Sequence, residues 1–163
     1  VKNINQFEPW RRWHILDWGI SNIANYFFND LTIKFLHTGI FRLRIPGLVW
    51  MYHKNLKAIK SIDYFGLNYY SHNHLKMQFS IKEPFLLKYY KQDIMTDMPY
   101  AIYGEGIYRA IKFVSKLNKP IIITENGIAV KNDKIRELFI KLLKLILLSV
   151  AKLFFSLSIL SFN

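Results

Sequence analysis

Apolar side chains recur at every fourth position between residues 21 and 37. They are Ile23, Phe27, Leu31 and Phe35. This spacing places them on one face of a helix, so it predicts an amphipathic helix over these residues. Gly39 follows at the place where helices commonly end on a glycine. The first predicted element is therefore a helix that stops just before Gly39.

A second helix is predicted from about residue 103 to residue 117. Its apolar stripe consists of Ile107, Ile111, Val114 and Leu117. Glu105 lies in its first turn, where a negative charge interacts favourably with the helix dipole. A further helix is expected to begin near Asp133, after Gly127. The stripe of the helix at residues 103–117 has the periodicity of an element that buries one face.

Two strands are predicted between these helices. Ile121-Ile122-Ile123 is continuously apolar rather than alternating, as in a parallel strand that is covered on both faces. Residues 62–70 form an aromatic-rich strand. Residues 41–60 are interpreted as an irregular connection, and residues 71–99 as a long polar and aromatic loop. The order strand, loop, helix, strand, helix is typical of an α/β fold with a parallel sheet.

Glu125 closes the apolar run and is followed at once by Asn126 and Gly127. In β/α folds the carboxyl ends of the strands face the substrate, so this carboxylate is a candidate catalytic group. The alternative is an Asn-Gly hairpin turn with the acid in solvent. A hairpin needs a second strand directly after Gly127, whereas residues 131–134 indicate a helix start. The catalytic interpretation is therefore favoured, and the hairpin stays open as the alternative.

Composition narrows the classes of protein to consider. The chain has 163 residues, 52% of them hydrophobic and 17% aromatic, which fits one domain with a core and excludes disorder for most of it. It has no cysteine, which excludes disulfides and thiol nucleophiles. No signal peptide is visible, and we expect a cytoplasmic location. Because the first residue is Val1 rather than Met, we expect an upstream part to be absent.

The net charge of +12 raises the question of a nucleic-acid or membrane partner. The basic residues are scattered, however, and no zinc-finger spacing, RNP-like motif or glycine-rich phosphate loop accompanies them. We therefore interpret them as solvated surface residues and expect no nucleic-acid partner. His72 and His74 could share a strand face, but no third ligand is evident, so no metal site is expected.

Two motifs resemble a known family. Residues 124–127 (TENG), after an apolar strand, resemble the nucleophile signature of the family 1 glycoside hydrolases, the β-glucosidase clan of (β/α)8 barrels. Residues 63–71 (DYFGLNYYS) resemble the motif of the sixth barrel strand in that family. Segments 35–47, 96–98 and 102–107 resemble its connecting segments in the same order. The similarity runs from about residue 1 to about residue 140.

The resemblance implies a partial (β/α)8 TIM barrel, roughly strands five to seven with their helices. It also implies that Glu125 is the nucleophile, and that Asn68 and Tyr70 line the sugar subsite with Tyr70 beside the nucleophile. Independently, Asn68 and Tyr70 are two residues apart in a strand and point the same way. A phenol next to a carboxylate can hydrogen-bond and aim it. The alternative for residues 68–70 is an aromatic strand end packed in a core.

The implied activity is hydrolysis of O-glycosidic bonds in β-glucosides or related β-glycosides, with retention and without a metal or organic cofactor. The second, proton-donating carboxylate of the family lies in an Asn-Glu-Pro motif. Glu8-Pro9 follows Phe7 and Glu83-Pro84 follows Lys82, so neither acid is assigned that role. We therefore interpret the chain as a C-terminal-half fragment that is inactive alone.

The similarity implies two parts, a partial barrel over residues 1–140 and a divergent apolar tail over residues 141–163. We interpret the tail as the product of a frameshift or truncation. Its apolar stretch, residues 145–160, is shorter than the ~20 residues of a membrane span and contains Lys152. The rival interpretation is a non-catalytic remnant that binds membranes through this basic apolar helix. Membrane contact is not favoured.

Overall fold

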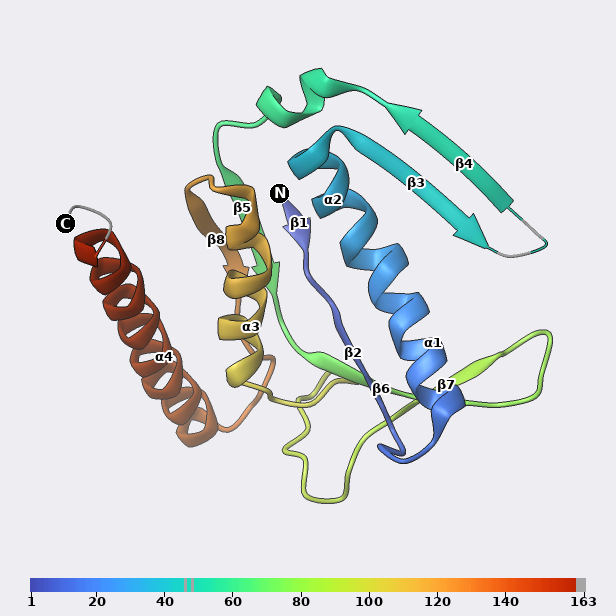
Figure 1. The fold of residues 1–163 in the computed structure, drawn as a ribbon. Helices are drawn as coiled ribbons and strands as arrows, with labels where there is room; N and C mark the ends of the chain where they lie inside the picture. Colours follow the sequence, from blue (N-terminus) through green and yellow to red (C-terminus); the bar gives the residue numbers. More distant parts are fainter. Residues whose placement is uncertain (46, 48, 161–163) are drawn as a thin grey trace.

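The computed structural model describes residues 1–45, 47 and 49–160, with side chains up to Val150. Parallel strands form its centre (Figure 1). One sheet has the order β1-β5-β8, and a second has the order β2-β6-β7. Within these two sheets, neighbouring strands pair in parallel, except that β6 and β7 pair antiparallel. The strands are β1 (Lys2–Asn3), β2 (Gln6–Pro9), β5 (Phe65–Tyr69), β6 (His72–Met77), β7 (Phe85–Lys88) and β8 (Ile121–Asn126).

The first predicted helix is present and longer than expected. It comprises α1 (Ile15–Asn25), a π-helical turn (Tyr26–Asp30) and α2 (Leu31–Thr38), which follow one another without a break. Its first turns do not show the apolar spacing because the residues that they bury, Asp17 and Ser21, are polar. The predicted second helix is confirmed as α3 (Glu105–Val114) with a 3₁₀ turn (Ser115–Leu117).

Gly39 ends α2 in the left-handed conformation, with φ of 71°. A Cβ at this position would lie 2.7 Å from the backbone oxygen of Asn55. Gly39→Ala is therefore expected to lower the free energy of unfolding by about 3 kcal/mol, from backbone strain and this contact. Gly47→Ala is the matched control, because Gly47 has φ of 73° but no heavy atom near its Cβ position. Urea denaturation should show a cost of only about 1 kcal/mol there; equal costs would contradict the argument.

The interpretation of residues 41–60 as irregular is wrong. Strands β3 (Ile40–Ile45) and β4 (Val49–Lys54) form an antiparallel hairpin, followed by a 3₁₀ turn (Leu56–Lys60). Exposed Arg42 and Arg44 alternate with half-buried neighbours, as expected of a strand with one face on a helix. The long-loop interpretation of residues 71–99 is also wrong in part, because that segment contains β6 and β7.

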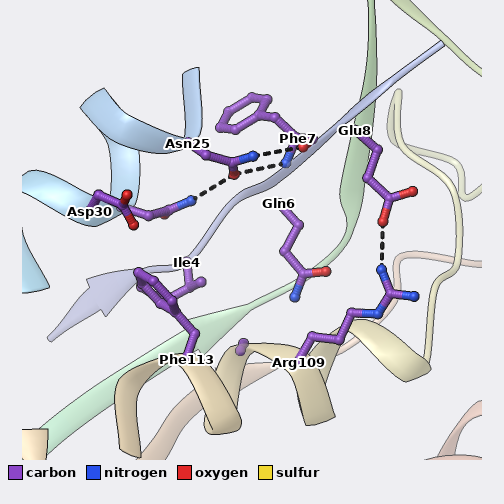
Figure 2. Close-up of a pocket in the computed structure, with 10 residues that line it drawn as sticks. Ile4, Gln6, Phe7, Glu8, Asn25, Asp30, Arg109 and Phe113 are labelled. Atoms are coloured by element: carbon purple, nitrogen blue, oxygen red, sulfur yellow. Dashed lines mark hydrogen bonds and ion pairs between the residues drawn. The ribbon is translucent and has the colours of Figure 1, made fainter. Parts of the chain in front are cut away.

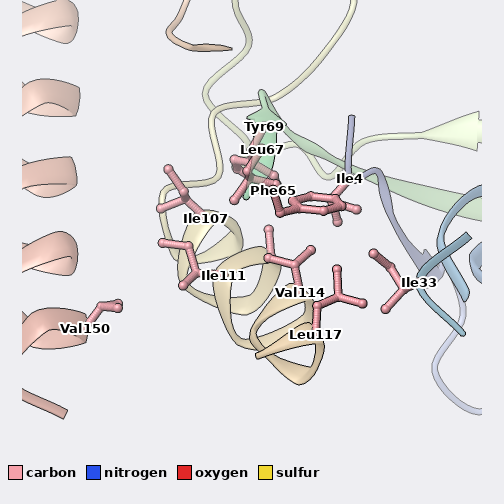
Figure 3. Close-up of a cluster of buried hydrophobic side chains, with 11 residues drawn as sticks. Ile4, Ile33, Phe65, Leu67, Tyr69, Ile107, Ile111, Val114, Leu117 and Val150 are labelled. Atoms are coloured by element: carbon pink, nitrogen blue, oxygen red, sulfur yellow. The ribbon is translucent and has the colours of Figure 1, made fainter. Parts of the chain in front are cut away.

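The hydrophobic core lies between β5 and α3 (Figure 3). Strand β5 contributes Phe65, Leu67 and Tyr69 to this core. Ile4, which follows β1, and Ile33 of α2 pack with them. The predicted stripe of α3 is confirmed in this core. Its members are Ile107, Ile111 and Val114, with Leu117 just beyond the helix. The residues of β5 that lie between these core positions therefore face away from α3.

Helix α4 (Asp133–Leu160) begins where a helix was expected and runs across the predicted boundary at residues 140 and 141. Val150 belongs to the core, and Leu143, Ile146 and Leu147 pack against it. Among residues 1–45, 47 and 49–160, no helix combines the length and apolar character that crossing a bilayer requires. The division of the chain into two parts stays a prediction.

Candidate active site

Strands β5 and β8 bring the three predicted site residues together. The Tyr70 hydroxyl donates a hydrogen bond of 2.6 Å to Oε2 of Glu125. Asn68 pairs in register with Glu125 across the two strands. Asn68 is buried, Tyr70 is partly exposed, and Glu125 is exposed. A carboxylate, a phenol and an amide therefore meet at the carboxyl ends of neighbouring parallel strands, where β/α folds place their reactive groups.

The Asn-Gly hairpin alternative does not hold. Strand β8 pairs in parallel with β5, and the element that follows Gly127 is helix α4. The carboxylate of Glu125 therefore does not sit at the tip of a β-hairpin. It ends a strand whose neighbour supplies its hydrogen-bond donor.

A β-bulge decides which face Glu125 occupies. Leu67 is paired with Ile123, but the next residue, Asn68, is paired with Glu125, so Thr124 is the extra residue of β8. Side chains alternate between the faces of a strand, and one inserted residue shifts everything after it to the other face. Without the bulge, Glu125 would point with Leu67 toward α3. With it, Glu125 shares the face of Asn68 and Tyr70.

Neighbouring hydrogen bonds fix this arrangement. The Thr124 hydroxyl donates to Oδ1 of Asn68. The Asn126 amide donates to the carbonyl oxygen of Tyr69 at 2.7 Å. Each contact joins β8 to β5 next to the bulge, so the two strands hold the shifted register. Thr124 and Asn126 belong to the TENG motif but were missed as site residues, because a sequence pattern does not show a bulge.

The hydrogen bond to Glu125 raises the pKa of the Tyr70 phenol above its usual value, with a smaller contribution from desolvation. Glu125→Gln removes the negative charge, so it is expected to return the pKa of Tyr70 toward about 10. Tyrosinate absorbance during an alkaline titration measures this, with Tyr70→Phe identifying the signal. An unchanged Tyr70 titration in the variant would mean that the two groups do not interact in solution.

Glu8, in β2, is paired with Arg109 of α3 (Figure 2). Nη1 of Arg109, in α3, donates to Oε1 of Glu8 at 2.6 Å. Nε2 of His74 lies 3.7 Å from the other oxygen of Glu8. Helix α3 packs on the face that carries Leu67, so Glu8 points toward that helix and away from the face of Glu125. Glu8 therefore acts as a partner of Arg109 in this fold.

His72 and His74 form a buried pair on the same side as Glu8. Their ring centroids are 4.6 Å apart, and both side chains are almost fully buried. Burial, with a smaller effect from His74, lowers the pKa of His72 to about 4. Within the described part of the chain, no three acidic or histidine side chains gather in a group that could hold a metal ion.

With this geometry established, comparison with known proteins decides the family. The model of glycosyl hydrolase family 1 matches residues 44–142, more than half of the chain. The chain belongs to glycosyl hydrolase family 1. The predicted family is therefore confirmed.

Solved structures of family 1 enzymes align over nearly the whole chain. A β-glycosidase from Pyrococcus horikoshii has 26% identity and a TM-score of 0.75, covering 93% of this chain and 34% of that protein. A β-glucosidase from Thermotoga maritima, solved with glucoimidazole, has 23% identity and a TM-score of 0.70, covering 93% and 38%. The predicted fold, a partial (β/α)8 barrel, is confirmed by these alignments.

A β-galactosidase from Pyrococcus woesei is 24% identical over 133 residues, which cover 71% of this chain and 26% of that protein. The chain thus spans about a quarter to two fifths of the length of these relatives. It contributes several β/α units of a family 1 barrel. The roles of Glu125, Asn68 and Tyr70 within that barrel stay predictions.

Proposed function

We propose that this chain is the nucleophile-bearing part of a glycoside hydrolase that cleaves β-glucosides or related β-glycosides with retention. The observation that carries the proposal is the 2.6 Å hydrogen bond from Tyr70 to Glu125 at the carboxyl ends of β5 and β8. Family membership supports the reaction class, and the TENG motif supports the choice of Glu125. Asn68, in register with Glu125, is proposed to bind a sugar hydroxyl.

In the first step, the Glu125 carboxylate forms a bond to the anomeric carbon while the bond to the leaving oxygen breaks. That oxygen takes a proton from a second carboxylic acid about 5–5.5 Å from the nucleophile. In the second step, the second carboxylate deprotonates a water molecule, which attacks the anomeric carbon and releases Glu125. The starting configuration is restored because the carbon is inverted twice.

Tyr70 supports the nucleophile in this scheme. Its hydroxyl holds one carboxylate oxygen, Oε2, which leaves Oε1 to attack. The bulge at Thr124 keeps this oxygen on the face that a sugar would approach. A nucleophile held in one orientation loses less entropy on reaching the transition state. Tyr70 is therefore proposed as a positioning residue, and Glu125 as the catalytic one.

The proton donor is proposed to lie outside this chain, since the sequence contains no Asn-Glu-Pro. The 163 residues alone should therefore not hydrolyse an unactivated β-glucoside. A chimera in which residues 1–142 replace the matching segment of the Pyrococcus horikoshii β-glycosidase should do so. The β anomer should be the first product by NMR. Turnover by the chain alone, or a folded chimera without turnover, would contradict the proposal.

A further inference from the structure

A groove runs between the helix α1–α2 and strand β3. It contains two cavities of about 510 Å³ and 360 Å³, and both are lined by Tyr26. Arg44 lines the larger cavity, and Arg42 and Lys34 line the smaller one. Cavities of this size are typical of ligand sites. In Figure 1 the helix separates the hairpin from β1 and β2, so the groove lies outside the sheet that carries Glu125.

Tyr26, which lines both cavities, is the first residue of the π-helical turn. Its hydroxyl donates to the backbone oxygen of Arg42, which ties the helix to β3. The ammonium group of Lys34 lies 5.6 Å from the centre of its ring. Single π-helical turns inside α-helices are frequent at functional sites. Here the turn supplies an aromatic side chain with a cation beside it.

The hairpin adds two more pairs of a cation and an aromatic ring. Arg42 faces Tyr52 and Arg44 faces Trp50 across the strands, with guanidinium-to-ring distances of 5.8 Å and 4.7 Å. Arginines two residues apart lie on one face of a strand. Trp50 is 72% exposed and Tyr52 54% exposed. The outer face of the hairpin is therefore both aromatic and positively charged.

The segment that forms one wall of the groove and the hairpin is strongly positively charged. Between residues 31 and 62 the chain has no Asp or Glu. The basic residues there are Lys34, Arg42, Arg44, Lys54, Lys57 and Lys60. Asp30 also lines the groove, and its Oδ2 accepts a hydrogen bond of 3.2 Å from Nζ of Lys34. Among the described side chains, in residues 1–45, 47 and 49–150, no ion pair joins Arg42 or Arg44 to a carboxylate. Both guanidinium groups are thus available to an anionic ligand.

We propose that the outer face of the hairpin, along the edge of this groove, binds a carboxylate-bearing polysaccharide, with uronate groups on Arg42 and Arg44 and sugar rings against Trp50 and Tyr52. Guanidinium groups bind carboxylates through two parallel hydrogen bonds. Aromatic rings offer flat apolar faces to the C–H faces of a sugar. The choice of a glycan rests on the proposed function. The hairpin would anchor an acidic glycan on the outer side of the barrel.

Binding is tested on the whole 163-residue chain with three probes: a hexamer of galacturonate, a neutral hexamer of glucose, and poly(U) RNA. We expect the galacturonate hexamer to bind, the neutral hexamer to bind at least about tenfold more weakly, and added salt to weaken the interaction. In the unmodified chain, amide NMR signals of residues 26–54 should shift on titration. This mapping requires no variant, so it stands even if a variant misfolds.

The matched variants are Arg42→Gln/Arg44→Gln on the hairpin and Lys134→Gln/Lys144→Gln on α4, which remove equal charge from exposed positions. The first pair should weaken galacturonate binding at least about tenfold, and the second less than about twofold. Equal losses, shifts outside residues 26–54, or tighter binding of poly(U) would overturn the proposal. Glu125→Gln should leave this binding unchanged, so failure of the proposed hydrolysis and failure of the proposed glycan binding are separable.

Discussion

Replacing Glu125 with glutamine in the chimeric barrel is expected to lower kcat for a β-glucoside on the order of 10⁴-fold or more. The amide is a poor nucleophile, but it keeps the shape of the side chain. Its oxygen can still accept the hydrogen bond that Tyr70 gives to Oε2. The fold and the position of the side chain should therefore survive while the covalent step is lost. Initial-rate measurements with a chromogenic β-glucoside check this.

Glu83→Gln is the control for that experiment. Glu83 is an exposed acid in the segment before β7, so its replacement removes the same charge without touching the site. We expect its kcat to stay within about twofold of the parent chimera. If Glu125→Gln retained a tenth of the parent activity, Glu125 would not be the nucleophile. Tyr70→Phe should fall between the two, because it removes the positioning contact and leaves the carboxylate.

Replacing Asp17 with asparagine is expected to lower the free energy of unfolding by about 3 kcal/mol. The Asp17 side chain is fully buried and accepts two hydrogen bonds of 2.8 Å from the Arg11 guanidinium. It also accepts from the backbone N–H groups of Arg11 and Met77. The residue thus joins the start of α1 to the end of β6. An amide cannot satisfy all these donors, although partial exposure of Arg11 limits the cost.

The same variant should change the dependence of stability on pH. The side-chain hydrogen bond from Arg11, opposed in part by desolvation, holds the pKa of Asp17 well below its usual range. The unfolded chain therefore takes up the proton first as the pH falls below about 4. The contribution of Asp17 is present above that pH and is lost below it. Urea denaturation at pH 7 and pH 3 should show a smaller difference between wild type and Asp17→Asn at pH 3.

Glu137→Gln is the control for the pH series. Glu137 forms an exposed ion pair with Lys141 on α4, at 2.7 Å. Exposed pairs of this kind contribute about 0.5 kcal/mol or less. A loss as large for Glu137→Gln as for Asp17→Asn would show that overall charge, rather than the buried contacts of Asp17, controls the stability. A constant difference between wild type and Asp17→Asn from pH 7 to pH 3 would also contradict the account.

The elements that sequence reasoning located correctly are those with a local periodic signal. The stripe through Ile107 and Val114 identifies α3 because both residues face the core. The apolar run before Glu125 identifies β8, and its position before a helix indicates a parallel strand. Each pattern arises because one or both faces of a regular helix or strand are buried. Such a pattern can be recognised from the sequence alone.

The hairpin was misjudged although its signal is present. Phe41, Arg42, Leu43 and Arg44 alternate between apolar and charged, which is the pattern of a half-buried strand. Pro46 and Gly47, which lie between the two strands, were interpreted as marks of an irregular connection. The positive charges of Arg42, Arg44 and Lys34 appear scattered in the sequence. Lys34 and Arg42 line one cavity only because β3 packs beside α2.

The bulge at Thr124 could not be predicted. The run Ile121-Ile122-Ile123 is apolar on both faces, so it gives no alternation from which a shift of register could be noticed. The choice of face for Glu125 depends on the pairing of β8 with β5, which is a tertiary property. The TENG motif predicts Glu125 as the nucleophile, but only the structure explains how this residue comes to share a face with Tyr70.

Covalent trapping tests the central claim most directly. A 2-deoxy-2-fluoro-β-glucosyl fluoride slows both steps of a retaining glycosidase and lets the glycosyl-enzyme accumulate. Incubation with the chimera, followed by peptide mapping by mass spectrometry, should show one fluoroglucosyl group on Glu125 and none in Glu125→Gln. A fluoroglucosyl group on any other carboxylate, or an active chimera that never acquires one, would contradict the account.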